Sequence, residues 1–154
     1  VPSASMPKTA ETSSNQTFID ITLTGITGLE IPLEIGTFSI HAGIHFTANT
    51  TDDAKWTISA QSGLVASRVR VGSACFDQAA GATLTDTGGF ATLGTSVVCN
   101  VASTGGHLLM VAGAITVSTV GSLRFDFAKN TDTSTDNTVL AASAFGLVRI
   151  GVTT

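Results

Sequence analysis

Residues 37–48 read TFSIHAGIHFTA. Every second residue of this stretch is apolar, namely Phe38, Ile40, Ala42, Ile44 and Phe46. A period of two is typical of a β-strand that buries one of its faces, because successive side chains point to opposite sides of a sheet. The stretch therefore predicts a strand with its apolar face on a core and with His41 and His45 on the other face.

Alternating runs of the same kind recur along the chain, separated by Gly, Asn and Asp, and no helical period lasts for a dozen residues. This pattern predicts an all-β protein, a sandwich or a barrel of about 8–10 strands. The run LEIPLEI at 29–35 contains Pro32, which lacks a backbone N–H and so indicates an edge strand or a bulge. The run TFIDITLT at 17–24 is expected to be a further strand, with Ile19 and Ile21 on one face.

The chain length favours one domain preceded by a short arm. Its 154 residues are enough for a single core. Residues 1–14 are rich in Pro, Ser and Thr, so we expect an extended N-terminal arm there and the sandwich domain over 15–154. Residues 121–150 are expected to form a hairpin with a polar tip. Neither a signal-peptide core nor an apolar run long enough to cross a membrane is visible.

The composition is low in charge. Charged residues make up 12% of the chain and hydrophobic residues 43%, whereas globular domains usually carry about 25% charged residues. The net charge of -4 and the lack of a basic run argue against nucleic acid as a partner. We expect a neighbouring subunit or a lattice, rather than water, to cover part of the surface.

Residues 107–117, HLLMVAGAITV, are apolar on both faces of the predicted strand. The strand could be buried within one domain, or it could place one face on the core and the other on another subunit; the low charge favours the second explanation. We therefore predict a symmetric homotrimer. Its candidate interface consists of His41, His45, Leu108, Met110, Ala112 and Ala114.

No metal, cofactor or enzymatic site is expected. His41 and His45 would lie about 13 Å apart on one strand, too far for one chain to bring both to a single metal ion. The acidic residues Asp52 and Asp53 stand in a turn-like stretch without a calcium-loop pattern. The sequence contains no catalytic motif that combines a nucleophile, a base and an orienting group.

The only two cysteines, Cys75 and Cys99, fall on predicted core-facing positions. We favour buried free thiols, since free cysteine is commonly buried; a disulfide is the alternative. The polar run near the C-terminus is a candidate exposed recognition loop, because such loops on rigid sandwiches often bind partners. It comprises Thr131, Asp132, Thr133, Ser134, Thr135, Asp136 and Asn137.

Two segments carry a family resemblance. Residues 36–59 resemble a strand–turn–strand pattern of tailed-phage virion proteins, which this chain matches at Thr37, Phe38, Ile40, Asp53, Lys55, Trp56, Ile58 and Ser59. The C-terminal part resembles the same family at Gly113, Ile115, Thr116, Gly121, Leu123, Phe125, Phe127, Ala128, Lys129, Asn130 and Thr131, and then at Ser143, Phe145, Leu147 and Arg149.

The resemblance covers roughly residues 17–150, with a poor match over about 62–106, and brings no catalytic residues. It implies an antiparallel jelly-roll sandwich that trimerises and is displayed on the surface of a phage particle. Its partners would be other copies of the chain and the major capsid protein or another virion protein, with no nucleic acid and no membrane. Two roles follow: a capsid decoration or head-fibre protein that stabilises the shell, which a short chain with a polar arm favours, and the receptor-binding tip of a tail fibre or spike.

Overall fold

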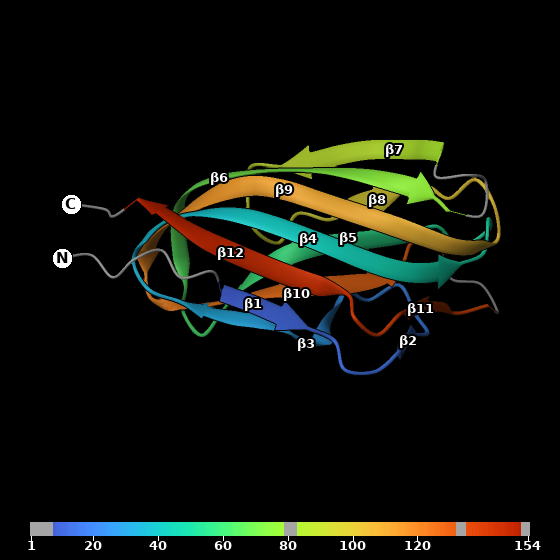
Figure 1. The fold of residues 1–154 in the computed structure, drawn as a ribbon, viewed down its shortest axis with the longest axis horizontal. Coiled ribbons are helices and arrows are strands. Elements are labelled where there is room, and N and C mark those ends of the chain that lie inside the picture. The colour runs from blue at the N-terminus through green and yellow to red at the C-terminus, as the bar shows by residue number, and fades with distance from the viewer. Residues whose placement is uncertain (1–7, 79–82, 132–134, 152–154) are drawn as a thin grey trace.

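The computed structural model describes residues 8–78, 83–131 and 135–151. These residues contain strands and turns but no helix. Figure 1 shows the strands stacked in two layers. The strands are β1 (Lys8–Glu11), β2 (Gln16–Phe18), β3 (Thr24–Leu33), β4 (Gly36–Ala48), β5 (Ala54–Gln61), β6 (Val65–Asp77), β7 (Thr83–Phe90), β8 (Val97–Cys99), β9 (Gly105–Thr119), β10 (Gly121–Lys129), β11 (Asn137–Val139) and β12 (Ala144–Gly151).

The two sheets are antiparallel and pair strands that are distant in the sequence. The larger sheet has the order β1-β12-β4-β9-β6-β7, with β2 and β11 paired beside β4. The smaller sheet has the order β3-β10-β5-β8. This arrangement confirms the predicted all-β jelly-roll sandwich. The strand count exceeds the expected 8–10 because β1, β2, β8 and β11 are only three or four residues long.

The core between the sheets is made by the alternation that the sequence predicts. All six apolar residues of 37–48, Ala48 included, are buried on β4. Trp56 of β5 stacks on Phe125 of β10, with ring centroids 5.4 Å apart. Pro32 lies on β3, which is an edge strand as predicted.

The expected strand over 17–24 is wrong beyond Phe18. The side chain of Asp20 accepts a hydrogen bond from the backbone N–H of Thr22 at 2.8 Å, and this Asx turn replaces strand pairing. Ile19 and Ile21 are consequently 67% and 44% exposed.

The second half of the predicted N-terminal arm is paired with the sandwich. Residues 8–11 form β1 and pair with β12, so that Lys8 lies opposite Leu147. Thr12 is buried, and its hydroxyl donates to the carbonyl of Leu140 at 3.1 Å. Hydrogen bonds thus attach residues 8–12 to the sandwich, although these residues have little apolar side-chain area. Residues 1–7 lie outside the described residues.

Two further expectations differ from the structure. Residues 121–150 do not form a hairpin, because β10 belongs to the smaller sheet and β12 to the larger one. Cys75 and Cys99 form a disulfide rather than two free thiols, with their Cα atoms 5.9 Å apart. Both side chains point inward as predicted, but they come from opposite layers, β6 and β8, and therefore meet in the core.

Candidate assembly face

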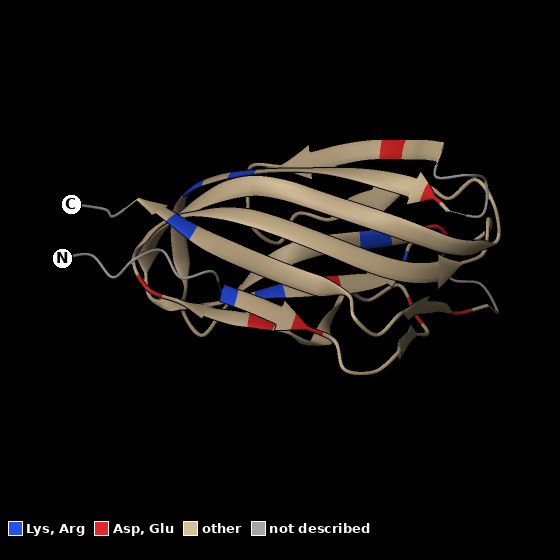
Figure 2. Cartoon of the chain, in the orientation of Figure 1, with Lys and Arg blue, Asp and Glu red and all other residues tan. Residues whose placement is uncertain are grey.

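The six candidate interface residues lie together on the outer face of the larger sheet. β4 and β9 are neighbours in register, with His41 opposite Ala112 and His45 opposite Leu108. Neither strand contains a Lys, Arg, Asp or Glu, and the middle of this sheet is correspondingly free of charged residues in Figure 2. Directly opposed residues of an antiparallel pair share a face. The candidate residues therefore form one continuous, uncharged surface, which we call the assembly face.

Because one face of β9 is exposed, this strand is not buried on both faces within a single domain. Leu109, Val111, Ile115 and Val117 are buried on the core side. On the other side, Met110 is 51% exposed and Ala112 is exposed, while Leu108 and Ala114 are half-buried. Among the described residues of the single chain, no second layer covers this outward row.

Two hydrophobic residues that the sequence analysis missed extend the assembly face. Phe76 of β6 lies opposite Leu108, and Leu84 of β7 lies opposite Phe76. Leu84 is 52% exposed. Continuing the alternation of β6 past Cys75 would have placed Phe76 on the outer side, but the bulge between Cys75 and Phe76 in the pairing with β7 has no clear sequence signal.

The backbone beneath the two histidines is held in place by β12 and the turn before it. A Cβ atom on Gly146 would lie 2.4 Å from Nε2 of His41, so a side chain at this position would displace the imidazole ring. The backbone N–H of His45 donates to Oγ of Ser143 at 2.9 Å, and the carbonyl of His45 accepts from the same hydroxyl at 3.2 Å. Ser143 is itself fully buried. These contacts make this part of the face pre-formed.

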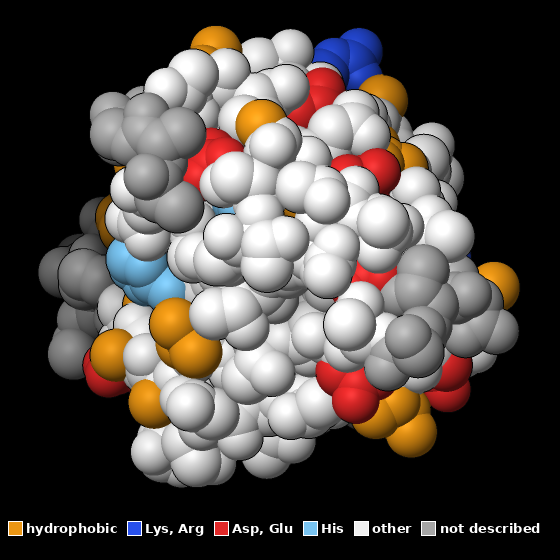
Figure 3. Space-filling model, turned by 90° about the vertical axis from the view of Figure 1, so that its right-hand side faces the viewer, with side chains coloured by type: hydrophobic (Ala, Val, Ile, Leu, Met, Phe, Trp, Pro, Cys, Tyr) orange, Lys and Arg blue, Asp and Glu red, His pale blue; other side chains and the backbone are white. Residues whose placement is uncertain are grey.

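β11, which follows the candidate recognition loop, lies at one end of the sandwich (Figure 1). Figure 3 shows this end from outside, with several Asp and Glu side chains on its surface. Asp132, Thr133 and Ser134 lie outside the described residues. Both flanks of the loop are anchored: Lys129 Nζ donates to the carbonyl of Thr135 at 2.7 Å, and Asn137 Nδ2 donates to the carbonyl of Asp53 at 2.8 Å. Asn137 was expected to be exposed but is fully buried, because its amide satisfies the turn at Asp53. Thr131, Thr135 and Asp136 are exposed.

Two fully buried side chains outside the loop, Asp52 and Lys129, contact it. The Thr135 hydroxyl donates to Oδ2 of the fully buried Asp52 at 2.6 Å. Lys129, also fully buried, lies 3.6 Å from the carboxylate of Asp136. In the part of the chain that the structure describes, no three His, Cys, Asp or Glu side chains come close enough together to hold a metal ion.

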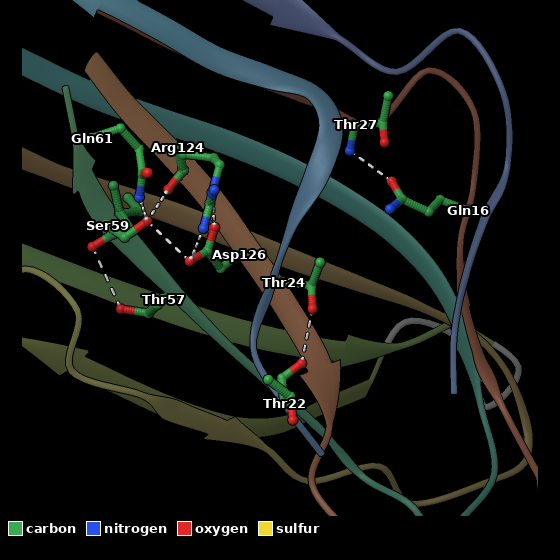
Figure 4. A network of polar contacts seen from close by, with 10 residues as sticks. Gln16, Thr22, Thr24, Thr27, Thr57, Ser59, Gln61, Arg124 and Asp126 are labelled. Carbon is green, nitrogen blue, oxygen red and sulfur yellow. Dashed lines mark hydrogen bonds and ion pairs between the residues drawn. The ribbon is translucent and has the colours of Figure 1, made fainter. Parts of the chain in front are cut away.

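The outer face of the smaller sheet is polar, in contrast to the assembly face (Figure 4). Asp126 accepts from Arg124 Nε at 2.6 Å and from the Ser59 hydroxyl at 2.9 Å, and Gln61 donates to Ser59 at 3.0 Å. The hydrogen bond to Asp126 raises the pKa of Arg124. We call these four residues the polar network.

One buried titratable group is separate from both outer faces. His107 of β9 is 1% exposed and lies beside Phe46, with ring centroids 5.2 Å apart. Burial lowers the pKa of His107, and the nearby Asp77 carboxylate opposes that shift only in part. Burial therefore favours the neutral form of this ring.

Comparison with known proteins supports the fold. No family model matches the sequence, and neither does any curated protein. The structure is similar to that of the Eiger TNF from S. frugiperda, at a TM-score of 0.50 and 10% sequence identity, with 98% of this chain and 96% of that chain covered. The fold is a TNF-like jelly roll. A second likeness, to infectious bursal disease virus Gx strain, has a TM-score of 0.21, 13% identity and coverage of 97% and 43%, and supports no conclusion.

The comparison establishes the fold alone, because a sequence identity of 10% carries no function with it. The described residues contain no helix long and apolar enough to span a membrane. Function has to be argued from the faces of the sandwich.

Proposed function

We propose that the chain is a non-enzymatic structural protein of a phage particle, which forms a homotrimer and binds the assembled shell from outside. The single observation that carries the proposal is the assembly face. It is uncharged over two long strands and exposes Met110 and Leu84 by about half. A contiguous exposed apolar patch often marks an interface between proteins. A second copy of the chain would cover it.

The family resemblance supports the placement on a virion. Its aromatic and aliphatic positions form the core: Phe38, Trp56, Phe125, Phe127 and Phe145 are all buried. The matching residues therefore specify a sandwich rather than a reactive site. A protein whose recurring residues are structural is suited to a geometric role, such as covering a symmetry point of a capsid.

Such a decoration protein would act by linkage. A protein that binds the assembled shell but not its free subunits stabilises the shell by RT ln(1 + [L]/Kd) per site, about 2.7 kcal/mol at a hundredfold excess over Kd. Repeated over many sites, this would raise the resistance of the particle to heat or internal pressure. None of the side chains would have to react.

A second role, recognition of the host by a fibre or spike tip, is favoured by the anchored loop. Thr131, Thr135 and Asp136 are exposed between flanks fixed by the buried Lys129 and Asn137. A polar loop on a rigid frame can bind a receptor at a low cost in conformational entropy.

Particles with and without the protein separate the two roles. For a decoration protein, we expect particles that lack it to release DNA at a lower temperature and to adsorb to host cells normally. Unchanged heat resistance combined with lost adsorption would reject decoration in favour of the tip. Unchanged heat resistance and adsorption would reject both roles.

A further inference from the structure

β6 has an open edge that neither proposed role uses. β7 pairs with β6 only from Val71 to Asp77, and Figure 1 shows β7 ending partway along β6. Residues 65–70 are paired on their other side by β9 alone. Within the described part of the chain, no backbone hydrogen bond joins residues 91–96 to this edge. Peptide groups of β6 are thus free to pair with an added strand.

The two basic residues of β6 stand at this edge. Arg68 lies opposite Thr116 and Arg70 opposite Ala114, so both side chains are on the outer face. Figure 2 shows the basic residues of β6 beyond the end of β7. Both are exposed, neither takes part in an ion pair among the described residues, and the one hydrogen bond of Arg70 goes to the neighbouring carbonyl of Val69.

Among the described residues, the absence of an ion pair distinguishes Arg68 and Arg70 from four of the other five basic residues. The chain has only 7 Lys and Arg residues, and Lys8, Arg124, Lys129 and Arg149 each lie within ion-pair distance of a carboxylate. Two guanidinium groups on one face of β6, with no carboxylate of the described residues in ion-pair distance, therefore form a local positive site on a chain with a net charge of -4. Such a site attracts carboxylates or phosphates.

A hollow lined by both apolar and polar residues lies on the inner side of the same edge. It has a volume of about 320 Å³ and adjoins a second hollow, which Arg68, Arg70 and Ala91 line. The lining of the first includes Leu64, Val69 and Leu93. An apolar side chain that points inward from an added strand would therefore meet other apolar side chains.

We propose that the open edge of β6 binds an acidic extended peptide segment of a partner protein, which adds to the sheet in line with β7. Residues opposite Arg68 and Arg70 would face outward and carry carboxylates, and the residue opposite Val69 would face inward and be apolar. The preferred sequence is therefore acidic–apolar–acidic. Residues 1–7 of another copy do not fit, because VPSASMP contains no acidic residue.

The test uses a fluorescent peptide, Ser-Thr-Asp-Val-Asp-Thr-Ser, titrated with the intact protein and followed by fluorescence polarisation at low and high salt. We expect saturable binding that weakens as the salt concentration rises. Replacing both Asp residues of the peptide by Asn should weaken binding at least about tenfold. The isomer with Asp-Asp-Val in the centre should also bind more weakly, because its carboxylates point to opposite faces.

Protein variants locate the site. The double variant Arg68→Gln, Arg70→Gln should lose about tenfold in affinity. Lys55→Gln is the matched control: it removes a basic residue without an ion pair from the smaller sheet, and it should bind the peptide as the wild type does. The oligomeric state of each variant is measured alongside, so that a change in assembly is not mistaken for a change in binding.

Three outcomes would overturn the proposal. No binding of the Asp peptide at millimolar concentration would reject the site. Equal binding of a peptide that is N-methylated at Val and at the following Asp would show attraction by charge without strand pairing. Displacement of the peptide by glucuronate at an equal concentration would assign the site to a compact acidic saccharide instead of a strand.

Discussion

The two outer faces of this sandwich are built from the same kind of strand but differ in chemistry. On the smaller sheet, Arg124, Asp126, Ser59 and Gln61 bond to one another and satisfy their charges within the chain. On the larger sheet, β4 and β9 present His, Ala, Leu and Met with no charged residue. The first face is complete in the single chain, whereas the second leaves apolar area exposed.

This difference shows which side of the molecule a partner would cover. Burying the polar network under another protein would remove water from charged groups, which is costly unless the partner replaces every contact. Burying the assembly face would remove mainly apolar area from water, at roughly 25 cal/mol for each Å². The free energy of association therefore favours the larger sheet.

The largest effect is expected from a charge placed in the assembly face. Met110→Asp would bury an unpaired carboxylate in the proposed contact and should dissociate the trimer to single chains. Val98→Asp is the matched control, since Val98 is a partly exposed apolar residue of the smaller sheet, 36% exposed. Sedimentation velocity should show monomers for the first variant and unchanged trimers for the second. Trimers in both variants would show that Met110 is not part of the interface.

An effect of intermediate size is expected from the polar network. Asp126→Ala removes a carboxylate that is 4% exposed and leaves Arg124 and Ser59 without their acceptor. We expect the free energy of unfolding to fall by about 1–3 kcal/mol, with the oligomeric state unchanged. Denaturant unfolding at several protein concentrations measures both quantities. A loss of trimer at full stability would mean that this face also takes part in assembly.

The smallest effect is a pH dependence from the core beneath the assembly face. The pKa of His107 is lowered by burial, so the unfolded chain binds a proton in a pH range where the folded chain does not. The free energy of unfolding should therefore fall as the pH drops below the unfolded value of 6.5. The variant His107→Gln should flatten this slope in thermal unfolding between about pH 7.5 and 5.5. An equal slope in the His107 variant would assign the effect to another group.

Long regular strands could be predicted from the sequence. Residues 37–48 and 107–117 alternate over enough positions to assign the face of each side chain. The alternation of the two strands places all six candidate interface residues on one surface. The short strands could not be predicted, because three or four residues show no period. β1 depends instead on hydrogen bonds and on the contact of Lys8 with Glu34, which link segments far apart in the sequence.

Other features required knowledge of which layers face each other. The inward direction of Cys75 and Cys99 was predicted, but their disulfide depends on β6 and β8 lying in opposite sheets at the same depth. The burial of Asn137 likewise depends on the turn at Asp53, which is 84 residues away in sequence. The open edge of β6 arises because β7 stops at the partner of Val71, and no local pattern indicates where a neighbouring strand ends.

The mass of the wild-type protein in solution tests most directly whether the assembly face joins three chains. Light scattering coupled to gel filtration should give three times the chain mass of 15.6 kDa, unchanged on dilution through the micromolar range. A soluble species of one chain mass at these concentrations would contradict the proposed trimer, and the assembly face would then need a different partner.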